Sequence, residues 1–346
     1  MIKQDHIFHY PVEFPLESGT KLPGLQLKYT TLGQLNKERS NVVWVCHALT
    51  GSSDFTDWWN GLFSEGSPFD PSRYFIICAN SLGGCYGSTG PLSINPLSGK
   101  PYYHEFPLIT NRDIVQAFDL LREHLGIKRI HTLIGGSLGG QQVLEWAIQQ
   151  PQKVEHIIPV ACNAFHSPWG IAFNEAQRMA IAADPTWKES DARAGIEGMK
   201  AARAIAMISF RSYDIYNRNQ PEVAGEKLNQ FRASSYQQYQ GSKLANRFNA
   251  FSYWTLLNAM DNHHVGRGRG TVEEVLSTIK AKTLIIGVNS DILFPPSEQE
   301  TLAKLIPNAR LELLSTDYGH DGFLVEFEQF RTLIRTFLTT KENILL

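Results

Sequence analysis

Short apolar runs rich in β-branched residues alternate with helical patterns along most of the chain. The runs predict strands at residues 41–46, 74–78, 129–134, 154–160, 283–288 and 310–314. Between the second and third runs, Ile114, Ala117, Leu120 and Leu121 recur at helical spacing, which predicts a helix over 110–125. Further helices are expected at 138–150, where Pro151 ends the pattern, and at 327–338. Continuously apolar strands separated by helices predict an α/β fold with a mostly parallel sheet covered on both faces.

The pattern changes between residue 164 and about residue 276. Few strand-like runs occur there, and the segment is typical of several helices joined by polar loops, with one helix expected at 195–209. The strand pattern then returns. We therefore expect a sheet-based core made of residues 1–163 and 277–346, interrupted by a helical insertion at 164–276.

Composition narrows the class of protein without pointing to a function. Hydrophobic residues make up 42% of the 346 positions, charged residues make up 19%, and the formal net charge is −2. This balance supports a buried core and gives no indication of a nucleic-acid or membrane-surface partner. No apolar run has the length of a signal peptide or a membrane span, and the four cysteines form no CxxC pair, so neither a zinc site nor a redox motif is predicted. We expect a cytoplasmic protein.

The strongest chemical motif is a G-x-S-x-G at 135–139, centred on Ser137. It follows a predicted strand and opens a predicted helix, which is the context of a nucleophile elbow. Glycines two positions to either side of the serine remove the Cβ atoms that would collide in such a tight turn. The alternative is a glycine-rich turn that cradles a phosphate at the helix N-terminus. The position after a strand favours a nucleophilic serine.

An acid and a base follow in the order that this fold requires, serine first, then a carboxylate, then histidine. Asp291 comes just after the predicted strand at 283–288, and His320 follows the strand at 310–314. Both are expected on loops at the carboxyl ends of strands, where α/β sheets place their chemistry. His320 would accept the serine proton, and Asp291 would orient the imidazole. Asp317 and Asp321 compete for the acid role, but they lie too close to His320 in sequence.

Acyl transfer also needs two N–H donors for the oxyanion of the tetrahedral intermediate. We expect one from Leu138, directly after the nucleophile, and the other from the loop after the strand at 41–46, with Leu49 as the candidate. The same loop could be no more than a strand-exit turn, and a turn can serve both purposes.

Several segments together resemble the homoserine O-acetyltransferase family, from about residue 10 to the C-terminus. They are HALTG at 47–51, CANSLGGC at 78–85, GSTGP at 87–91, SINP at 93–96, IGGSLGG at 134–140 with LEWA at 144–147, and GHDGFL at 319–324. The chain departs from the family mildly at Ser81, where valine is frequent, and at Leu138, where methionine is common.

The resemblance implies an α/β-hydrolase fold in which the insertion is a lid over a deep tunnel. It implies an acyltransferase that moves acetyl from acetyl-CoA to the hydroxyl of L-homoserine in methionine biosynthesis. The route would be ping-pong through acyl-Ser137, in a homodimer without a bound cofactor or metal. Arg211 would bind the substrate carboxylate and Asp321 the substrate ammonium. The planar fork of an arginine suits a carboxylate, although a salt bridge for Arg211 and a turn-capping role for Asp321 are alternatives.

Other activities remain open on the same scaffold. They are succinyl transfer, serine as the acceptor, ester hydrolysis, and a non-catalytic binding protein. Arg267 and Arg269, in the segment 262–270, could hold a phosphate of coenzyme A, but the same segment could be a simple connection from lid to core.

Overall fold

The computed structural model describes residues 2–59, 61–222, 225 and 228–340. Its centre is an eight-stranded sheet in the order β1-β4-β6-β5-β7-β8-β9-β10. The six strands from β6 to β10 in that order run parallel, whereas β1 and β4 run antiparallel at one edge. The strands are β1 Gln4–Tyr10, β4 Leu25–Leu32, β5 Val42–Cys46, β6 Phe75–Ala79, β7 Ile130–Gly136, β8 Val154–Val160, β9 Lys282–Val288 and β10 Ala309–Leu314. A small hairpin, β2 Phe14–Pro15 with β3 Lys21–Leu22, lies outside this sheet.

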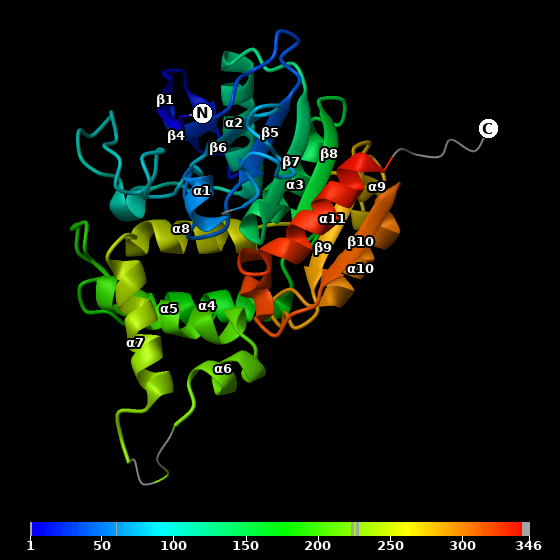
Figure 1. Ribbon diagram of the computed structural model, residues 1–346. Helices are drawn as coiled ribbons and strands as arrows, with labels where there is room; N and C mark the ends of the chain where they lie inside the picture. Colours follow the sequence, from blue (N-terminus) through cyan, green and yellow to red (C-terminus); the bar gives the residue numbers. More distant parts are fainter. Residues whose placement is uncertain (1, 60, 223–224, 226–227, 341–346) are drawn as a thin grey trace.

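Helices cover both faces of the sheet, which explains why its strands are apolar on both sides (Figure 1). One face packs against α2 and α3, where Trp44 of β5 meets Trp146 of α3 with 4.8 Å between ring centres. The other face packs against α1 and α11 through Phe55 and Phe330. The helices of the core are α1 Phe55–Trp58, α2 Asn111–His124, α3 Leu138–Gln149, α9 Val272–Leu276, α10 Pro296–Leu305 and α11 Phe327–Thr339, with 3-10 turns η1 Tyr103–Glu105 and η2 Gly319–Leu324.

Five helices between β8 and α9 form a separate layer, in green and yellow in Figure 1. They are α4 Pro168–Ala182, α5 Ile196–Phe210, α6 Tyr213–Asn219, α7 Arg232–Ala245 and α8 Ala250–Asp261. Apolar side chains of this layer, among them Met199 and Leu256, belong to the same buried cluster as α2 and α3. The layer is therefore packed onto the core by hydrophobic contact.

The predicted fold class is confirmed. Each of the six expected strands is present, with ends that differ from the prediction by at most two residues. The three helices expected in the core are present as α2, α3 and α11, whereas α1, α9 and α10 were not predicted. The sequence analysis did not identify the antiparallel edge strands β1 and β4. In the part of the chain that the structure describes, no helix is both long enough and apolar enough to cross a membrane.

Candidate active site

Ser137 lies at the sharp turn between β7 and α3, in a backbone conformation that side chains rarely adopt. Its φ is 57° and its ψ is −124°. A Cβ on Gly139 would come within 2.1 Å of the carbonyl oxygen of Cys46, and a Cβ on Gly135 within 2.5 Å of the carbonyl oxygen of Gly139. Only glycine fits at either position, because a backbone atom cannot move aside as a side chain can. Strain of this kind persists where the surrounding structure enforces it, as it does at many active sites.

The turn presents the serine to a cavity of about 180 Å³. Ser137 is nearly buried and lines this cavity together with His320, Asp321 and Leu49. The main-chain carbonyl of Ser137 accepts a hydrogen bond from Gln141 in the first turn of α3, whereas its hydroxyl has no hydrogen-bond partner among the described residues. The hydroxyl is thus available to a base or a substrate within the cavity.

His320, in η2, is held by Asp291, in the loop after β9. Nδ1 of His320 donates to Oδ2 of Asp291 over 2.6 Å. The second oxygen, Oδ1, accepts the main-chain N–H groups of Leu293 and Phe294 at 2.8 and 2.9 Å. Three donors therefore fix the buried carboxylate. This arrangement leaves Nε2 of the imidazole free to act as a base, since Nδ1 carries the proton.

The surroundings of His320 act on its pKa in opposite directions. Burial favours the neutral ring, but the negative charge of Asp291 and the hydrogen bond to it outweigh burial, so the pKa of His320 is raised above its ordinary value of 6.5. The ring is also packed between aromatic side chains, with Phe294 at 5.2 Å and Phe323 at 5.5 Å between ring centres. Packing and charge together hold the imidazole in one orientation.

The loop after β5 brings a second amide to the cavity. Leu49 lines the cavity, and within the described residues its N–H donates to no other group. The N–H of Leu138 belongs to the first turn of α3, where amides have no partner inside the helix. The ring of His47 anchors this loop, since Nδ1 donates to the carbonyl of Ala48 at 2.8 Å and Nε2 accepts the N–H of Ser81 at 2.9 Å. Burial lowers the pKa of His47 to about 4, so the ring is uncharged at neutral pH, and its two hydrogen bonds place the proton on Nδ1.

Arg211 and Asp321, the two residues expected to recognise the substrate, contact each other. Nη2 of Arg211 lies 3.1 Å from Oδ2 of Asp321, and both side chains are largely buried. The two face neighbouring spaces, because Asp321 lines the cavity of Ser137 whereas Arg211 lines an adjoining cavity of about 100 Å³ with Tyr216 and Tyr318. Nε of Arg211 is buried and has no partner among the described residues.

The end of α5 is docked closely on the loop that carries His320. A Cβ on Gly319, whose φ is +68°, would lie 2.8 Å from the main-chain nitrogen of Ser212. The hydroxyl of Ser212 also donates to the carbonyl of Asp317. The inserted helices therefore contact the loop that carries the histidine.

Sequence reasoning missed two arginines of this site. Arg203 of α5 and Arg247, between α7 and α8, line the cavity of Ser137 together with Phe210. No motif marks them, because their place in the cavity depends on how the inserted helices pack on the core. By contrast, Arg267 and Arg269 point elsewhere and pair with Glu17 at 2.9 Å and Glu145 at 2.6 Å.

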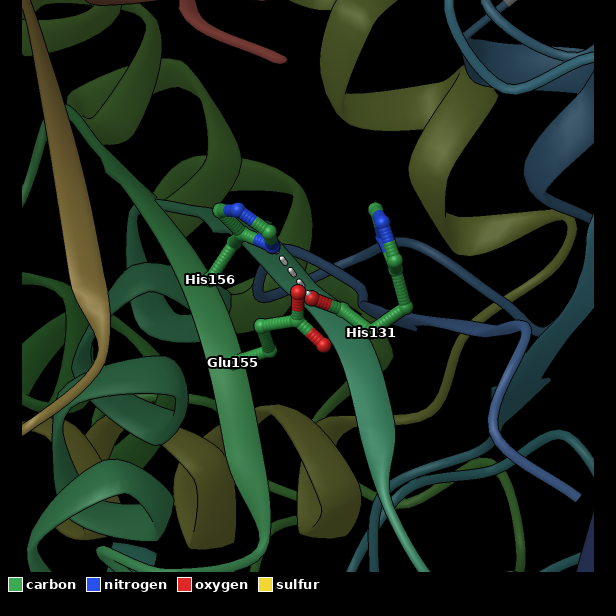
Figure 2. A group of neighbouring side chains, drawn as sticks. All are labelled: His131, Glu155 and His156. Carbon is green, nitrogen blue, oxygen red and sulfur yellow. Dashed lines mark hydrogen bonds between the residues drawn. The ribbon is translucent and has the colours of Figure 1, made fainter. Parts of the chain in front are cut away.

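A possible metal-binding group lies far from this cavity. The ligand atoms of His131, Glu155 and His156 lie within 4.8 Å of one another, at the amino ends of β7 and β8 (Figure 2). Nδ1 of His156 already donates to the carbonyl of His131 at 2.9 Å. Ser137 follows the opposite end of β7, roughly 20 Å away at the rise of an extended strand. A metal ion held there could not touch a substrate at Ser137.

Known proteins resemble this chain in both sequence and fold. Residues 41–327 match the α/β-hydrolase fold family. A homoserine O-acetyltransferase of Cyclobacterium marinum is 53% identical over 331 residues, which cover 96% of this chain and 94% of that protein. The crystal structure of homoserine O-acetyltransferase from Bacillus anthracis superposes with a TM-score of 0.92 at 26% identity and covers 99% of both chains. Esterase E22 superposes with a TM-score of 0.87, also at 26% identity, over 97% of this chain and all of that one.

Proposed function

The chain belongs to the homoserine O-acetyltransferase family within the α/β-hydrolase fold, and from this we propose that it transfers the acetyl group of acetyl-CoA to the side-chain hydroxyl of L-homoserine. The observation that carries the proposal is the single cavity lined by Ser137, His320 and Asp321, with Asp291 bonded behind the histidine. It unites a nucleophile, a base and a carboxylate that can face an amino group.

In the first half-reaction Nε2 of His320 takes the proton of Ser137 while the serine oxygen attacks the thioester carbonyl. The N–H groups of Leu49 and Leu138 stabilise the oxyanion that forms. When the intermediate collapses, the C–S bond breaks and the imidazolium returns the proton to the sulfur of coenzyme A. The products are acetyl-Ser137 and free coenzyme A.

In the second half-reaction homoserine enters the same cavity. His320 takes the proton of its hydroxyl, the alkoxide attacks the acetyl ester, and the proton returns to Ser137 as O-acetylhomoserine leaves. The imidazolium that forms in each half is stabilised by Asp291, whose second oxygen remains fixed by two main-chain amides.

Arg211 and Asp321 would recognise the acceptor as a zwitterion. A carboxylate of the substrate binds the guanidinium, and its ammonium binds Asp321, so the ion pair between the two residues is replaced by two ion pairs to the substrate. The buried, unpartnered Nε of Arg211 supports this role, because a buried donor without an acceptor is costly until one arrives.

The proposal also covers the lid, the pathway, the cellular compartment, the oligomeric state and the cofactor requirement. Within the predicted insertion at 164–276, the helices α4 to α8 would act as the lid. The enzyme would work in methionine biosynthesis as a cytoplasmic homodimer, and it would need no bound cofactor or metal. All four cysteines are unpaired, which supports a reducing compartment.

Ester hydrolysis is the second candidate, since the fold is shared with an esterase. Loss of the acetyl-CoA thioester, measured with and without homoserine, separates the two. We expect thioester loss to depend on homoserine, and loss at the same rate without it would identify a hydrolase. A panel of acetyl-CoA and succinyl-CoA against homoserine and serine then tests the donor and the acceptor. An absence of turnover with every donor and acceptor pair would indicate a non-catalytic binding protein.

A further inference from the structure

Two positive charges in the catalytic cavity have no part in the chemistry described above. Arg203 and Arg247 both line the cavity that contains Ser137. Within the described residues no carboxylate lies at ion-pair distance from either guanidinium, whereas Arg211, Arg267 and Arg269 each have such a partner. Asp321, which supplies the only carboxylate among the described residues that line the cavity, is already paired with Arg211. The cavity therefore has an excess of positive charge, which favours an anion.

Arg247 is held in place at the solvent-exposed side of the cavity. Its Nη1 donates to the carbonyl of Thr50 over 2.7 Å and also contacts the hydroxyl of Tyr86. Thr50 directly follows Leu49, so the guanidinium is attached to the loop that supplies a proposed oxyanion donor. Its Nε and Nη2 have no acceptor among the described residues and remain available to a ligand.

Arg203 is half-buried and lies next to the rings around the proposed base. Its guanidinium stacks over Phe210 at 5.1 Å, and the ring centre of Phe210 lies 5.7 Å from that of His320. Stacking fixes the plane of the guanidinium, whose edge also interacts with the hydroxyl of Tyr253.

We propose that Arg203 and Arg247 form an anion subsite that binds a phosphate group of the acyl donor. The inference rests on the proposed function and goes beyond it by naming how the donor is held. The donor is a thioester that carries several phosphates on a long arm, and the exposed position of Arg247 lets such an arm extend into solvent. The acceptor carries one carboxylate, which Arg211 already matches. Guanidinium groups bind phosphate through paired, charge-assisted hydrogen bonds.

The test compares two donors that differ in their phosphates. We would assay Arg203→Gln and Arg247→Gln with acetyl-CoA and with S-acetylpantetheine, which has no phosphate. The control is Lys243→Gln, which removes a charge one turn away from Arg247 and outside the cavity. Each arginine variant should raise the KM for acetyl-CoA about 10- to 100-fold, the range of a lost hydrogen bond to a charged group. The KM for S-acetylpantetheine should rise at least ten times less, and Lys243→Gln should change neither.

Three results would overturn the subsite. They are equal losses with both donors, a rise in the KM for homoserine in place of acetyl-CoA, and a wild-type KM for acetyl-CoA that does not rise with ionic strength. If the wild type fails to use acetyl-CoA yet hydrolyses p-nitrophenyl acetate, the proposed function fails instead. In that case calorimetric binding of coenzyme A to the wild type and to Arg247→Gln still decides the subsite. Arg247→Lys, which keeps the charge, should recover part of the affinity, and melting temperatures identify any variant that does not fold.

Discussion

The guanidinium of Arg211 lies 3.1 Å from the carboxylate of Asp321, so a residue at the end of α5 is joined to the one that directly follows His320. The pair satisfies both charges while the acceptor is absent. A zwitterionic substrate must separate them and offer each a new partner. A ligand with only one of the two charges leaves the other residue buried and unpaired, which is costly. Under the proposed function, the pair would select for amino acids.

Asp321→Asn and Arg211→Ala should each raise the KM for homoserine by about one to two orders of magnitude, the size of a charged hydrogen bond. The KM for acetyl-CoA should change little, in contrast to the variants of Arg203 and Arg247. Steady-state kinetics with each substrate varied in turn measures both constants. Expressed as free energy, the effect of the double variant on the KM for homoserine should be smaller than the sum of the two single effects, because the residues contact each other. Additive losses would mean that they act separately.

Ser137→Ala should lower the turnover number by a factor of about 10³ or more, since no other hydroxyl stands at the elbow. The wild type, incubated with acetyl-CoA alone, should gain the mass of one acetyl group on the peptide that contains Ser137. Intact-protein and peptide mass spectrometry detect the adduct. Ser93→Ala, a change outside the cavity, is the control. An adduct on another residue would show that the nucleophile was assigned wrongly.

Asp291→Asn should keep the fold and lower the turnover number roughly 10³- to 10⁴-fold, because the amide favours the wrong tautomer of the imidazole. It should also change the pH profile. Asp291 raises the pKa of His320, and the ring must be neutral to act as a base. Without the carboxylate the pKa falls, so the acidic limb of the residual activity should move to lower pH. If the acidic limb of the pH profile does not move, the group that titrates there is not His320.

The same interaction should make stability depend on pH. The pKa of His320 is higher in the folded chain than the 6.5 of an unperturbed histidine, so the folded state binds the proton more tightly. The resulting stabilisation is complete below about pH 6.5 and is lost as the pH rises through the folded value. The melting temperature of the wild type should exceed that of His320→Gln by more at pH 6 than at pH 9. A difference that grows with pH would contradict the assignment.

Gly139→Ala should destabilise the fold by about 1–3 kcal/mol, a typical cost of overpacking. The added methyl group would meet the carbonyl of Cys46 at 2.1 Å, and neither backbone segment can move without disturbing β5 or the elbow. Gly225→Ala is the matched control, because a Cβ there has nothing within 4 Å. Urea denaturation measures both. Equal stability of the two variants would show that the elbow tolerates a shift.

The strands and core helices could be predicted because their signals are local. β5 is short and continuously apolar, β7 and β8 are apolar apart from two polar residues near the start of each, and α3 begins at the glycine-rich motif. β1 is harder to recognise, since in QDHIFHY most side chains are polar and only Phe8 is fully buried. Its place depends on pairing with β4, a contact made at long range.

The residues of the candidate site also differ in whether the sequence could predict them. Ser137, Asp291 and His320 could be assigned because each follows a strand, and a parallel sheet brings its carboxyl ends together. The contact between Arg211 and Asp321 could not be inferred, because it depends on where the end of α5 settles on the loop at 317–321. Arg203 and Arg247 have no sequence signal, since an arginine on a helix, like Arg203, or in a connecting turn, like Arg247, is usually solvated.

The inserted helices have a consequence for how the enzyme is made. Ser137 is translated before the whole of the layer from α4 to α8, and Asp291 and His320 only after it. A ribosome that has just completed β8 carries the proposed nucleophile without its base. If these residues act as proposed, the growing polypeptide cannot consume thioesters before the covering helices exist, and it becomes active only after the last strand, β10, has been made.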